Sequence, residues 1–67
     1  MKDIIINTED RFIGRHKDHR ISIVRVDDMF DLDIQDKTHM NIMEMHSYFK
    51  NMKEVIRFAK KYVNRNG

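Results

Sequence analysis

The chain has 67 residues, of which 36% are charged and 40% hydrophobic, and it carries a formal net charge of +2. This composition is typical of a folded protein, and the length allows one small domain over residues 1–67 with a marginal core. The absence of cysteine excludes disulfides and thiolate metal sites, and the absence of an export signal or a membrane-length apolar stretch predicts a cytoplasmic protein with no membrane partner.

Two short segments near the N-terminus favour strands. Residues 2–7 hold a run of three isoleucines, and residues 11–15 hold Phe12 and Ile13. Both segments are short, so the number of strands is left at three or four.

The middle of the chain predicts a hairpin. The polar residues 16–19 are typical of a turn, and they lead into a strand over residues 20–26, which is rich in Ile and Val. Asp27 and Asp28 then predict a tight connection to the next strand.

The clearest strand pattern follows this connection. Apolar and polar side chains alternate over residues 30–35, as they do in a strand with one buried face. We therefore expect the core-facing residues to be Phe30, Leu32 and Ile34. Asp31 and Asp33 are expected to face solvent.

From Ile42 onward the apolar spacing changes to the threes and fours of an amphipathic helix. The residues that share this spacing are Ile42, Met45, Phe49, Met52, Ile56, Ala59 and Val63. Asn41 is placed to cap the helix with Glu44 at its third position, and Met40 and Met45 are placed for a hydrophobic staple.

A second capping pattern lies inside this predicted helix. Asn51 and Glu54 repeat the Asn-x-x-Glu spacing, which leaves open a break near Lys50 into two shorter helices. Together the elements predict an α+β fold, with a small antiparallel meander of three to four strands followed by a C-terminal amphipathic helix packed on one face. The apolar stripe is wider than a coiled-coil seam, which favours packing on the sheet, and a homodimer through the helix is the alternative.

The sequence contains no recognisable motif for catalysis or for a cofactor. His16 and His19 are spaced as metal ligands could be, but they lack a matched second pair, so we expect surface histidines and no bound metal. The hydroxyl residues lie in no strained-turn nucleophile motif, and Gly14 by itself cannot form a phosphate-binding loop. We therefore predict no enzymatic activity and no cofactor.

Charge is sorted along the chain into three blocks of alternating sign. Residues 11–25 sum to +4, residues 26–36 to −5, and residues 50–65 to +5. Such patches steer binding partners more effectively than a small net charge does. The predicted acidic binding residues are Asp27, Asp28, Asp31, Asp33 and Asp36. The predicted basic binding residues are Arg11, Arg15, Arg20, Lys50, Lys53, Arg57, Lys60 and Lys61.

These blocks favour a small non-enzymatic regulator or inhibitor that binds a protein partner, such as nucleic-acid-handling machinery. Five aspartates within residues 26–36 repel phosphate, whereas they suit a basic protein groove. A small nucleic-acid-binding protein that uses the basic helix side and the block at residues 11–25 is the alternative. Nine isoleucines against one leucine and one alanine indicate an AT-rich coding genome, such as that of a low-GC bacterium or its phage.

Overall fold

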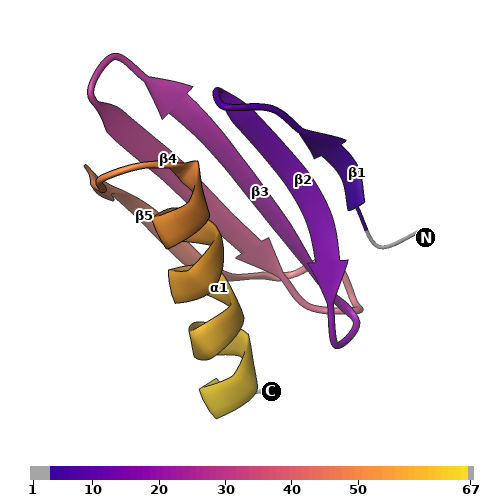
Figure 1. Cartoon of the computed structure of the whole chain (residues 1–67). Helices are drawn as coiled ribbons and strands as arrows, with labels where there is room; N and C mark the ends of the chain where they lie inside the picture. Colours follow the sequence, from indigo (N-terminus) through magenta and orange to yellow (C-terminus); the bar gives the residue numbers. More distant parts are fainter. Residues whose placement is uncertain (1–3, 67) are drawn as a thin grey trace.

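A computed structural model describes residues 4–66 of the chain, and in this range it shows a five-stranded antiparallel sheet with one helix (Figure 1). Neighbouring strands in the sequence are neighbours in the sheet, in the order β1-β2-β3-β4-β5. The elements are β1 (Ile4–Asn7), β2 (Arg11–His16), β3 (His19–Val26), β4 (Met29–Gln35), β5 (Asn41–Tyr48) and α1 (Met52–Asn66). The predicted α+β meander with a C-terminal helix is confirmed, but the prediction of three to four strands is wrong by at least one.

Two-residue turns join the central strands, at the positions where the sequence predicts them. Lys17 and Asp18 have φ values of 51° and 66°, as a type I′ hairpin turn requires, and Asp27 has a φ of 58°. Such turns match the right-handed twist of the strands they connect. They set the register between β2, β3 and β4, and with it the face of the sheet on which each side chain lies.

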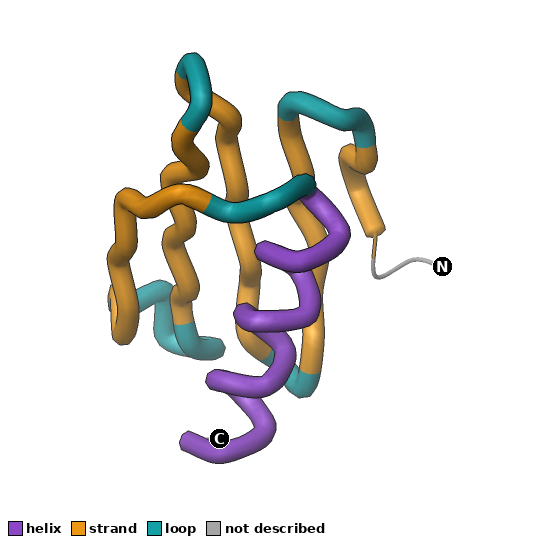
Figure 2. The backbone as a smooth tube through the Cα atoms, turned by 60° about the vertical axis from the view of Figure 1, so that its left-hand side comes forward, coloured by secondary structure: helices purple, strands orange, loops and turns teal. Residues whose placement is uncertain are grey.

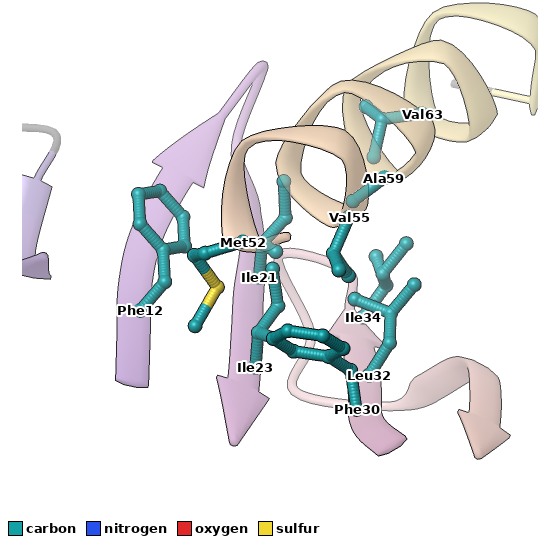
Figure 3. Packing of buried hydrophobic residues seen from close by; sticks show 10 residues of the cluster. All are labelled: Phe12, Ile21, Ile23, Phe30, Leu32, Ile34, Met52, Val55, Ala59 and Val63. Atoms are coloured by element: carbon teal, nitrogen blue, oxygen red, sulfur yellow. The ribbon is translucent and has the colours of Figure 1, made fainter. Parts of the chain in front are cut away.

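The core lies between the sheet and α1, which packs on one face of it (Figure 3). Phe30, Leu32 and Ile34 are 3%, 1% and 0% exposed, so the predicted inward face of β4 is confirmed. On α1, the buried residues are Met52, Val55, Ala59 and Val63. Ile21 and Ile23 from β3 complete the centre of this layer, because β3 lies directly under the helix.

The predicted helix start at Ile42 is wrong, because residues 41–48 form strand β5. Pairing with β5 satisfies the outer backbone groups of β4, which would otherwise lie unpaired beside a fully buried row of side chains. The register skips Ile42, because Ile34 pairs with Met43 and Gln35 with Asn41. This bulge interrupts the strand alternation, and so the apolar spacing imitates a helix.

The helix begins at the second capping pattern instead. The backbone N–H of Glu54 donates to Oδ1 of Asn51 at 3.0 Å, the geometry of an N-cap. Asn41 and Glu44 do bond to each other, from Nδ2 to Oε2 at 2.8 Å, but they do so on a strand. The break that the sequence leaves open near Lys50 is therefore the boundary between strand β5 and helix α1.

The C-terminal half of α1 is hydrogen-bonded to two strands of the sheet, β5 and β2. The Tyr62 hydroxyl donates to the carbonyl of Ile42, in the β5 bulge, at 3.2 Å. On β2, the ring Nε2 of His16 donates to Oδ1 of Asn64 at 2.9 Å. These bonds fix the direction in which α1 crosses the strands.

The burial of β4 gives a first prediction. Leu32→Ala should lower the free energy of unfolding by about 2–5 kcal/mol, because it leaves a cavity in a fully packed layer. Asp31→Ala, one residue earlier on the opposite face, is the control and should cost far less. Urea denaturation measures both variants, and equal effects would mean that the strand register is wrong.

The helix cap gives a second prediction. Asn51→Ala should destabilise the protein by about 1 kcal/mol, since the Glu54 N–H loses its side-chain acceptor and keeps only the carbonyl of Asn51. Asn41→Ala removes the residue expected from sequence to cap the helix and should cost less. Thermal melting followed by circular dichroism would rank the two, and a larger loss at Asn41 would contradict the assigned helix start.

Candidate functional site

The candidate site is the face of the sheet opposite α1, which we call the open face. Helix α1 packs on the other side of the sheet (Figure 2), and at one end of the open face Asp36, Lys37 and His39 of the β4–β5 loop line a hollow together with Arg15 and Arg20. Side chains that face each other across neighbouring strands lie on the same side of an antiparallel sheet. The strand register therefore determines which residues share this face.

Four rows of open-face residues cross the sheet, and the row at one end is Arg15, Arg20, Gln35 and Asn41. The first row is Val26, Met29 and Tyr48. The second row is Arg11, Val24, Asp31 and His46. The third row is Ile6, Ile13, Ser22, Asp33 and Glu44. In the second and third rows, the side chains on β1 and β2 are basic or apolar, and those on β4 and β5 include carboxylates.

Asp31, Asp33 and Glu44 form an acidic cluster at the β4–β5 side of the open face. Asp33 lies directly opposite Glu44, and Asp31 lies opposite His46. The three carboxylates line one shallow hollow together with Met45 and His46. Like charges directly opposite each other in a sheet are destabilising, so this arrangement costs folding energy.

The electrostatics of Asp33 show this cost. Partial burial raises the pKa of Asp33 above its ordinary value, and the negative charges of Glu44 and Asp31 raise it further. Asp31 has a partner, because its Oδ1 accepts a hydrogen bond from the ring Nδ1 of His46. In the described part of the chain, no ion pair neutralises Asp33.

The other predicted acidic residues lie at the two ends of the sheet. Asp27 and Asp28 form the β3–β4 turn, and Asp36 follows β4 at the opposite end. Asp36 Oδ1 accepts hydrogen bonds from the Thr38 hydroxyl at 2.6 Å and the Thr38 N–H at 2.8 Å. These bonds lower the pKa of Asp36, and they show that its carboxylate stabilises the loop after β4.

The predicted basic residues divide between two sides of the molecule. Arg15 and Arg20 are cross-strand partners on the same face as Arg11, and we call these three the basic strip of the open face. Lys53, Arg57, Lys60 and Lys61 are exposed on α1, on the side away from its buried residues, and we call them the helix ridge. Lys50 lies before the helix, in a hollow that Arg25 and Asp28 also line.

The sheet therefore separates the basic strip from the helix ridge, and the predicted basic residues do not form one surface. Arg25, in the same sequence block, lies on the helix side of β3, where its guanidinium is 3.9 Å from the carboxylate of Asp10.

The two histidines with metal-like spacing flank the β2–β3 turn as cross-strand partners. Their rings are engaged with protein groups, since His16 bonds to Asn64 and the Nδ1 of His19 contacts the carbonyl of Lys17 at 2.8 Å. Within residues 4–66 no group of three or more His, Asp and Glu side chains is placed to hold a metal. In the same range, α1 is too short and too polar to cross a membrane.

Glu44 and His46 belong to the open face but are missing from the sequence-based prediction. The apolar spacing predicts a helix for both residues, and in a helix they have no cross-strand relation to Asp31 and Asp33. The alternation of Met43, Glu44, Met45 and His46 is a strand signal that could have placed them, but the helical spacing of the neighbouring apolar residues obscures it.

Comparisons with protein-family models, curated proteins and solved structures found no match to this chain. The open face and the helix ridge are therefore the features that bear on the function of the protein.

The acidic cluster gives a third prediction. Asp33→Asn should raise the free energy of unfolding at neutral pH by about 0.2–1 kcal/mol, because it removes a like-charge cross-strand pair. A raised folded-state pKa means that the charged form costs stability above that pKa, and protonation removes the cost. The gain should therefore shrink as the pH falls through the raised pKa of Asp33, and vanish below the ordinary value of 3.8.

Asp28→Asn, at an exposed turn position outside the cluster, is the control for this measurement. Thermal melting of both variants and the parent protein across a pH series would give the comparison. An equal gain from Asp28→Asn, or a gain at Asp33 that persists in acid, would contradict the assigned repulsion.

Proposed function

We propose that this protein is a small non-enzymatic regulator or inhibitor that binds a protein partner through its open face. The observation that carries the proposal is the acidic cluster, which holds three carboxylates together although their repulsion costs stability. A basic partner surface removes that repulsion, so the cluster gains more from such a partner than from solvent.

The chemistry of the open face favours a protein as the partner. It offers carboxylates, guanidinium groups and apolar side chains on neighbouring strands, and protein interfaces combine these groups. Nucleic acid presents phosphate along its whole length, which the acidic cluster repels. The class of partner we propose is a protein with a basic groove, such as nucleic-acid-handling machinery, in which the carboxylates occupy phosphate positions.

Affinity capture from the source cell, with and without nuclease, tests this function. The matched variants are Asp31→Lys with Asp33→Lys on the open face, and Lys53→Glu with Arg57→Glu and Lys60→Glu on the helix ridge. We expect a captured protein that resists nuclease, is retained by the ridge variant, and is lost at least tenfold by the open-face variant. Circular dichroism and melting of both variants first establish that they fold.

The helix ridge supports a second candidate, a small nucleic-acid-binding protein. Four basic side chains are exposed on one side of α1, where Lys and Arg can neutralise phosphates. Binding to labelled duplex DNA and RNA should then weaken steeply with salt, with a log–log slope of about −0.9 per phosphate neutralised on DNA. Tight, salt-sensitive binding that the ridge variant abolishes would replace the protein-partner proposal with this one.

A further inference from the structure

The open face has a basic half and an acidic half. Its β2–β3 half carries the basic strip of Arg11, Arg15 and Arg20, and its β4–β5 half carries the acidic cluster. The rest of β3, which lies between Arg11 and Arg15 on β2 and the acidic cluster on β4 and β5, presents Ser22, Val24 and Val26, and the two valines are 36% and 43% exposed. A surface with opposite charges on its two halves and apolar residues along the middle can be complementary to itself.

We propose that a second copy of the chain covers the open face, in a symmetric dimer of two stacked sheets. The two-fold axis lies between the sheets and runs parallel to the strands near β3. This rotation places β2 of one copy opposite β4 of the other, because it reverses the strand order but preserves position along the strands. Each interface contact then occurs twice, as in other two-fold dimers.

Under this rotation each row meets the same row of the other copy, so one row pairs opposite charges directly and the third row places Ile13 opposite Asp33. Arg11 and Asp31 belong to one row, so each Arg11 faces the Asp31 of the other copy, and Val24 meets its own counterpart near the axis. The neighbouring Arg15 can reach toward Asp33 of the other copy, whose charge the monomer leaves without an ion pair within residues 4–66. Arg20 meets its own copy near one end of β3, beside a hollow that Asp33 and Glu44 also line.

The size of the face agrees with a stable dimer. The principal extents of the molecule are 30 × 23 × 17 Å, and the sheet occupies the broad side. The rectangle that bounds this side has an area on the order of 700 Å², so the open face can bury at most about that area in each copy, against the roughly 800 Å² per partner of a standard interface. Aligned packing of two sheets also buries the apolar side chains of the first row and of β3.

This inference goes beyond the proposed function, because it concerns the protein alone. The dimer would cover the same carboxylates that bind the target, so target binding and self-association would compete. If the protein does not self-associate, the dimer proposal fails, and the capture experiment still tests the proposed function by itself.

Charge exchange between the two halves of the open face tests the dimer. Asp31→Lys with Asp33→Lys makes the face almost wholly basic, and Arg11→Glu with Arg15→Glu makes it largely acidic. Sedimentation across a hundredfold concentration range should show a dimer for the parent protein and a dissociation constant at least tenfold weaker for each variant. An equimolar mixture of the two variants should sediment as a dimer again, because each variant supplies the charge that the other lacks.

The milder pair Asp31→Lys and Arg11→Glu repeats the exchange within a single row, in case the double variants fold poorly. Lys53→Glu on the helix ridge is the matched control and should leave self-association unchanged. A parent protein that is monomeric throughout, or variants that dimerise as well alone as when mixed, would overturn the proposed interface.

Discussion

Strand β4 is the constraint on which the rest of the structure depends. Its pleat sends Phe30, Leu32 and Ile34 into the core and Asp31 and Asp33 onto the open face. A register shift of one residue would exchange these two sets, burying carboxylates and exposing the core. The hydrophobic layer and the acidic cluster are therefore two consequences of one strand register, and stability and charge pattern cannot vary independently along β4.

The two faces of the sheet differ in how their side chains are packed. Between the sheet and α1, side chains pack to nearly complete burial, and the Asn51 cap and the Tyr62 and His16 bonds fix how the helix lies. On the open face, Asp33 faces Glu44, and partial burial together with the negative charges of Glu44 and Asp31 raises the pKa of Asp33. A small domain has little stability to spare, so this costly arrangement supports the proposed binding role.

The charged side chains of the protein lie on two separate surfaces. The helix ridge faces solvent on a convex helix, whereas the basic strip and the acidic cluster share one broad sheet face. This separation supports a protein-binding open face, and it makes the ridge a distinct surface that can be varied alone. It also makes the open face complementary to itself, from which the proposed dimer follows.

The local pattern of the sequence determined the central strands, their two tight turns, the inward face of β4 and the apolar stripe of α1, because these depend on alternation, turn chemistry and helical spacing within a few residues. The identity of residues 41–48 was decided by the tertiary structure. Ile42, Met45 and Phe49 have helical spacing, yet the unpaired edge of β4 and a bulge at Ile42 make this segment a strand. Only that pairing brings Glu44 and His46 beside Asp31 and Asp33, since cross-strand neighbours are set by contacts between segments distant in the sequence.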